Sequence, residues 1–157
     1  MANINKWIAG AQTYSSGNLA DNTALASRAS GYYNICQVSA ADVVVDNSTN
    51  KDKFLTIESL FGSWTPTVND LVEFYLLYAP DGTNYESGSS TFLPTLDRLW
   101  RFRRLSTDTT AAAKRVVVQG PILPMKFKVL WRWRGTNSTA ASGNAMSWFT
   151  NNDDLNG

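Results

Sequence analysis

The chain has 157 residues, of which 12% are aromatic and 17% are charged, and its formal net charge is +1. These values predict one domain with its own hydrophobic core and exclude a disordered chain. The sequence contains no histidine and a single cysteine, Cys36, which excludes Ser-His and Cys-His catalysis, an intramolecular disulfide and cysteine-rich zinc sites. Cys36 lies in the apolar stretch YYNICQV and is predicted to be a buried, unreactive thiol.

Residues 1–20 contain no sustained apolar run, so they do not resemble a signal peptide. No apolar run in the chain approaches the roughly 20 residues needed to cross a bilayer. We therefore expect no membrane association, and synthesis and folding in a cytoplasm. Residues 1–20 are predicted to be a flexible arm, in which Trp7 and Ile8 become ordered on docking. The predicted domain covers 21–150, and 151–157 is a polar tail.

One short helical turn is predicted in 21–30, with Asp21 as its N-cap. The remaining pattern is that of strands separated by turns and loops, the longest loops being 47–52, 80–90 and 135–144. Segment 70–79 is apolar on both faces, which predicts a central strand. The predicted strands are 31–40, 41–46, 53–62, 70–79, 97–105, 114–120, 125–134 and 145–150.

The predicted fold class is all-β. No helix is long enough for parallel crossovers, so the seven or eight strands should be antiparallel. We expect an antiparallel β-sandwich of jelly-roll or Greek-key type.

Two of the predicted strands, 97–105 and 125–134, alternate between aromatic and basic side chains. Because successive side chains of a strand point to opposite faces, the aromatic residues should lie in the core and the basic ones outside it. The aromatic residues expected in the core are Trp100, Phe102, Phe127, Trp131 and Trp133.

The charges are unevenly distributed along the chain. Between Arg98 and Arg134, ten bases against one acid give +9, whereas four bases against twelve acids elsewhere give −8. One interpretation is that acids on neighbouring strands neutralise these bases on a solvated sheet face. The other is an interface that meets an acidic partner surface. The candidate interface residues are Arg101, Arg103, Lys126, Lys128, Arg132 and Arg134, together with Trp7.

Other classes of function receive less support from the sequence. Nucleic-acid binding is disfavoured, because an aromatic platform for bases should share a face with its cations. A carbohydrate-binding module needs exposed rings, for which Tyr32, Tyr33, Trp64, Tyr85 and Trp148 are the candidates and burial in the core is the alternative.

No carboxylate pair has a spacing typical of catalysis, and we predict a non-enzyme without cofactor or metal. The loop DGTNYE offers Asp81, Asn84 and Glu86 to a calcium ion, but a turn stabilised by its own Asp and Asn side chains is the preferred interpretation.

From Leu71 to Met146 the chain resembles small structural proteins of tailed bacteriophages. The segments that carry the resemblance are LVEFYLLYAPDGTNYESG, KRVVVQGPILPMKFKVLW and TAASGN, in that order, whereas WRWR at 131–134 is heavier and more basic than that pattern. The resemblance implies a virion component, most simply a capsid decoration (cement) protein. Its partners would be further copies of itself, as a trimer or another homo-oligomer, and the major capsid protein or a neighbouring virion protein. A head–tail junction or tail component is the alternative.

Overall fold

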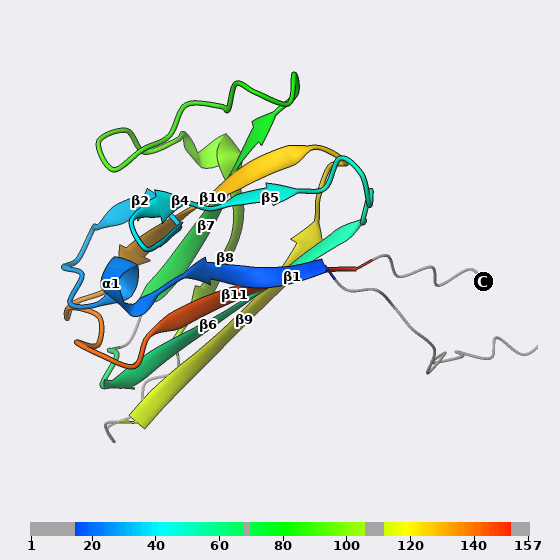
Figure 1. Ribbon diagram of the computed structural model, residues 1–157. Coiled ribbons are helices and arrows are strands. Elements are labelled where there is room, and N and C mark those ends of the chain that lie inside the picture. Colours follow the sequence, from blue (N-terminus) through cyan, green and yellow to red (C-terminus); the bar gives the residue numbers. More distant parts are fainter. Residues whose placement is uncertain (1–14, 68–69, 106–111, 152–157) are drawn as a thin grey trace, which may run out of the picture.

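The computed structural model describes residues 15–67, 70–105 and 112–151, and strands dominate them (Figure 1). All eight pairings between the described strands are antiparallel, which confirms the predicted all-β class. The elements are β1 (Ser15–Ala20), α1 (Asn22–Leu25), β2 (Tyr33–Ile35), β3 (Gln37–Val38), β4 (Ala41–Asp42), β5 (Val44–Asp46), β6 (Phe54–Trp64), β7 (Leu71–Ala79), η1 (Leu96–Arg98), β8 (Leu99–Arg104), β9 (Ala112–Pro121), β10 (Lys126–Arg134) and β11 (Ala145–Asn151).

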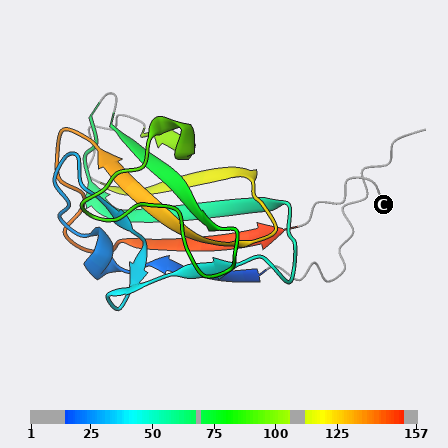
Figure 2. The same ribbon diagram turned by 90° about the horizontal axis from the view of Figure 1, so that it is seen from above.

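The strands form two main sheets. The first has the order β1-β11-β6-β9, and the second has the order β2-β10-β7-β8, with β5 also paired to β10. Figure 2 shows β7 and β10 lying across the strands of the first sheet. Strand β7 lies between β10 and β8, which confirms the central position predicted from its apolar residues on both faces.

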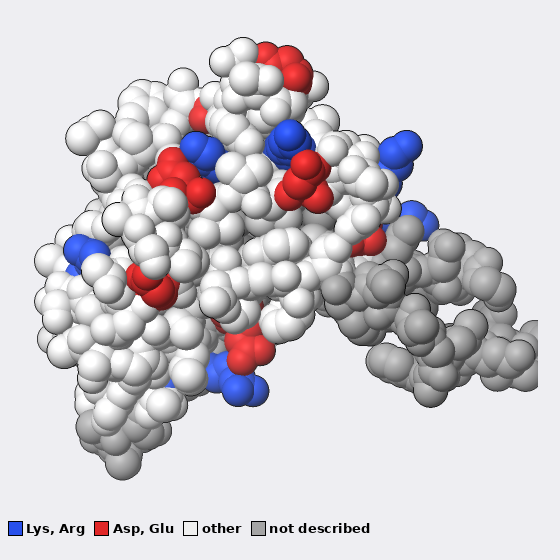
Figure 3. Space-filling model, viewed as in Figure 1, with Lys and Arg blue, Asp and Glu red and all other residues white. Residues whose placement is uncertain are grey.

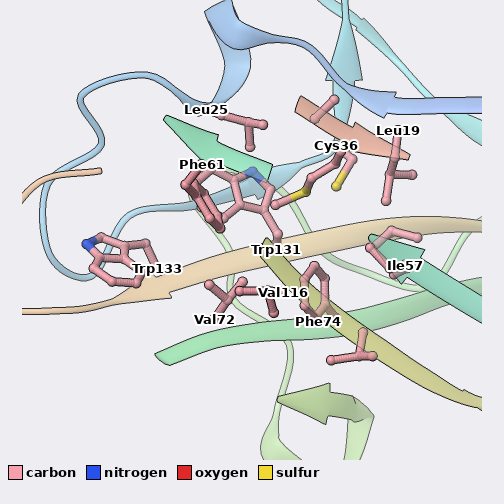
Figure 4. Packing of buried hydrophobic residues seen from close by; sticks show 14 of the residues in the cluster. Leu19, Leu25, Cys36, Ile57, Phe61, Val72, Phe74, Val116, Trp131 and Trp133 are labelled. Atoms are coloured by element: carbon pink, nitrogen blue, oxygen red, sulfur yellow. The ribbon is translucent and has the colours of Figure 1, made fainter. Parts of the chain in front are cut away.

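One cluster of buried side chains joins the two sheets. The first sheet contributes alternate residues of β6, including Leu55, Ile57 and Phe61, all fully buried. From the second sheet, Trp131 and Trp133 of β10 point into the same cluster (Figure 4). The alternation of 125–134 therefore has the expected effect: its aromatic residues build the core, and its basic residues face outward.

The segment between β7 and β8 covers part of the outer face of the second sheet, and in Figure 1 it rises above that sheet in green. Leu93 packs on a separate buried cluster made by Ile35, Tyr75, Leu77 and Leu130. This second cluster explains why β7 and β10 carry apolar residues on both faces.

The predicted boundary of the N-terminal arm is wrong. Ser15–Ala20 form strand β1, which pairs with β11, and Leu19 is fully buried. Only residues 1–14 of the predicted arm lie outside the described residues, and Trp7 is among them. At the other end, Asn151 belongs to β11 rather than to the predicted tail.

The predicted strands 31–40 and 41–46 are also broken into shorter pieces. Strands β2 and β5 follow one another along the same edge of β10, and the small β3–β4 hairpin lies between them in the chain. Cys36, at the break, is fully buried and its backbone N–H donates to the carbonyl oxygen of Val129. Burial raises the pKa of its thiol, as expected for an unreactive cysteine.

The expectation that Phe102 lies in the core is wrong, and a β-bulge explains why. In β8, Arg101 is opposite Phe74 but Leu99 is opposite Tyr75, so Trp100 is an extra residue in the ladder. Beyond the bulge the alternation is reversed, and Phe102 is 55% exposed although Trp100 packs against the core.

Candidate interaction surfaces

The lysines of β10 pair with acids of the small strands beside it. Lys128 Nζ lies 3.0 Å from a carboxylate oxygen of Asp42, and Lys126 Nζ lies 3.6 Å from one of Asp46. Burial raises the pKa of Asp42, but hydrogen bonds from Gln37 and Lys128 outweigh this effect and hold the pKa below its usual value. These contacts are the local charge compensation that one interpretation of the sequence predicted.

The arginines of β10 share one buried acid. Glu73, on β7, is 3% exposed and accepts from Arg134 at 3.0 Å and from Arg132 at 3.5 Å. The hydroxyl of Tyr75 donates to the same carboxylate at 3.0 Å. Burial and the neighbouring Glu73 raise the pKa of Tyr75, so its phenol keeps the proton that it donates. Nothing in the sequence indicated that Glu73 would be buried.

The six predicted basic residues do not form one surface. The four on β10 lie on the outer face of the second sheet, whereas Arg101 and Arg103 are opposite Phe74 and Val72, whose side chains point to the core side. On the face shown in Figure 3, blue and red side chains lie close together in small groups, and uncharged surface separates one group from the next.

Arg101 has a structural role. Its Nε donates to the carbonyl oxygen of Gln119 and its Nη1 to that of Trp100, each at 2.9 Å. A Cβ built on Gly120 would lie 2.6 Å from the guanidinium carbon of Arg101, so the side chain lies directly over a glycine of β9. Arg101 thus joins the edges of the two sheets.

The outer face of the first sheet is a surface that sequence reasoning missed. Its exposed apolar side chains include Val117, 47% exposed, and Phe149, 36% exposed, with Phe54 and Leu60 partly exposed on the strand between them. The charged residues described on it, Glu58 and Arg115, pair with each other at 3.1 Å. The sequence does contain a signal for this surface: in 53–62 and 114–120, some of the residues that alternate with the core residues are also apolar.

The aromatic residues considered for sugar binding are mostly engaged within the chain. Tyr32 packs on Trp131, with ring centroids 5.6 Å apart, and Trp64 packs on Trp133 at 4.9 Å. Lys128 Nζ lies 4.7 Å from the ring centroid of Tyr85. The other two candidates, Tyr33 and Trp148, pack against the buried clusters. These five rings therefore do not form an open stacking platform.

The loop DGTNYE is a turn of the kind that its sequence favoured. The Asp81 carboxylate accepts from the backbone N–H groups of Thr83 and Asn84, and these bonds lower its pKa. Glu86 points away from them, accepting from the N–H of Tyr78 and pairing with Arg98. Within the described ranges, no group of three His, Cys, Asp or Glu side chains could hold a metal ion.

A shallow hollow of about 290 Å³ lies beside Asp70, Arg132 and Arg134. The Asp70 carboxylate is occupied by the N–H groups of Thr67 and Thr136. With both arginines turned to Glu73, this hollow presents no uncompensated charge to a ligand.

Comparison with known proteins does not supply an identity, because no family model and no curated protein matches the chain. In the part of the chain that the structure describes, no helix is both long and apolar enough to cross a membrane.

Proposed function

We propose that this chain is a structural protein of a bacteriophage particle, made in the host cytoplasm and located in the virion as a capsid decoration (cement) protein. The proposal begins from the resemblance of residues 71–146 to such proteins. The structural observation that supports it is the outer face of the first sheet, which carries few charges, is not covered by the described residues, and exposes Val117 and Phe149. A broad face of this kind suits close contact with another protein.

We further propose that the two sheets form a β-sandwich with jelly-roll topology. The orders β1-β11-β6-β9 and β2-β10-β7-β8 support this, because each sheet interleaves strands from the beginning, middle and end of the chain. Double-sheet jelly rolls with eight strands recur in viral capsid proteins and in lectins. Of these two uses, the capsid role agrees better with aromatic rings that are engaged within the chain.

The mechanism would be binding energy alone. An oligomer, most simply a trimer on a symmetry axis, would bridge neighbouring capsid subunits. Because it binds the closed shell and not the dissociated subunits, it would stabilise the shell by mass action. No catalytic step and no cofactor is part of this proposal.

The test is reconstitution of particles that lack the chain. Adding the purified protein should raise the temperature at which the shell opens, measured by release of DNA to an intercalating dye. Val117→Lys should abolish this effect, because it places a charge in the proposed contact. The matched control is Val44→Lys, which changes a similarly exposed valine, 42% exposed, on the second sheet. Equal behaviour of the two variants would reject the first sheet as the contact face.

The solution mass, measured by light scattering after gel filtration, distinguishes the two places in the particle. A trimer favours the shell, whereas a ring-sized oligomer favours the head–tail junction.

A further inference from the structure

Strand β9 is an edge of the first sheet, and part of this edge has no strand partner. It pairs with β6 on one side, and in the described part of the chain no strand pairs with its other side. By the alternation of a strand, residues 113, 115 and 117 direct their backbone N–H and C=O groups to the same side as the carbonyl of Gln119. An unpaired edge of this length is a template for an additional strand.

Only one end of this edge is occupied. Trp100 Nε1 donates to the carbonyl oxygen of Pro121 at 2.8 Å, and Arg101 Nε donates to that of Gln119. Both donors come from the bulge of β8. Residues 113, 115 and 117 lie beyond these two bonds, and among the described strands none pairs with the backbone groups that they direct away from β6.

Two arginines of β8 beside this edge, Arg101 and Arg103, have no carboxylate partner among the described residues. Arg101 bonds carbonyl oxygens rather than a carboxylate. Arg103 is exposed, and the described ion pairs do not include it. Arg115 is 67% exposed and already has Glu58 as its partner. Arg101 reaches β9 from the adjoining edge, and Arg103 lies two residues further along β8 on the same face, so Arg103 is the cation without a partner that an acidic segment along β9 would approach.

We infer that the β9 edge accepts an extended acidic segment of another protein, which adds a strand beside 113–117 and places carboxylates against Arg103. This inference deepens the proposed function, on which it rests for the source of the partner, by naming the partner's chemistry. A second copy of β9 is a poor occupant, because two-fold pairing would bring Arg103 and Arg115 of each copy close to those of the other. Nucleic acid would satisfy the charges but not the backbone groups of the edge.

The test uses the purified full chain and a capped peptide of alternating glutamate and valine, labelled with a fluorophore. Fluorescence anisotropy should show binding that weakens with added salt. Arg103→Glu should weaken binding about tenfold or more, because it sets like charges against each other. The matched control, Lys51→Glu, makes the same change of charge in the distant loop 47–52 and should change the dissociation constant by less than about twofold.

Hydrogen exchange separates strand addition from simple charge attraction. The peptide should slow exchange of the backbone amides of 113, 115 and 117, and a lysine–valine peptide should not. Absence of this protection, equal weakening by the two charge variants, or tighter binding of an oligothymidylate would overturn the inference. Because the assay contains no particles, its failure leaves the virion role to be judged by reconstitution.

Discussion

Glu73 joins β7 and β10 on the outer face of the second sheet. It is buried, and three donors on two strands converge on its carboxylate. Glu73→Gln removes the charge but keeps the shape, so it should lower the free energy of unfolding by about 1–3 kcal/mol. The measurement is urea unfolding followed by tryptophan fluorescence.

The control for this prediction is Glu58→Gln, which breaks the more exposed pair with Arg115. Exposed ion pairs contribute little, so this variant should lose less than about 1 kcal/mol. If the two variants lost similar amounts of unfolding free energy, burial would not make the contacts of Glu73 stronger than those of Glu58.

Periodicity alone predicted which residues of 125–134 enter the core, since Phe127, Trp131 and Trp133 are all fully buried. It did not predict where the charges go. The partners Asp42 and Asp46 come from strands at least 80 positions away in the chain, and short strands of two or three residues leave almost no periodic signal.

At the scale of elements, Asp21 joins helix α1 to the β3–β4 hairpin. Its carboxylate accepts from the N–H of Ser39 at 2.7 Å and from that of Ala24 at 3.0 Å, the second being the N-cap bond predicted from the sequence. These two bonds hold the pKa of Asp21 below its usual value, and the bond from Ser39 has the larger effect. The carboxylate therefore stabilises the folded chain above the unfolded pKa of about 4, and this contribution is lost as the pH falls through the lower, folded pKa.

Asp21→Asn should accordingly cost stability at pH 7 and progressively less below about pH 4. Urea midpoints of both proteins between pH 7 and pH 3 measure the difference. A difference that stays constant over this range would show that ionisation of Asp21 is not the cause.

The bulge in β8 shows where prediction from the sequence fails at this scale. The letters LWRFRR alternate regularly, and nothing in them indicates that the ladder inserts an extra residue at Trp100. The cause is tertiary: Trp100 and Arg101 both turn to the carbonyl groups of β9, and Phe102 is left exposed. For this reason the interface predicted from alternation alone combined Arg101 and Arg103 with the basic residues of β10, although the two sets lie on different surfaces.

For the whole molecule, the all-β class followed from the turn signals and the near absence of helical pattern. The outer face of the first sheet, on which the proposed function rests, could not be predicted in this way. Val117 and Phe149 are far apart in the sequence, and only the pairing of the strands places them on one face. Which of two faces is covered is a property of the assembled sheets rather than of any single strand.

The most direct test of the proposed role is the protein content of purified particles from cells that carry the gene, measured by quantitative mass spectrometry. The proposal predicts that the chain copurifies with intact particles in a fixed ratio to the major capsid protein, with many copies per shell. Its absence from particles while it is abundant in the same cells would contradict a virion role.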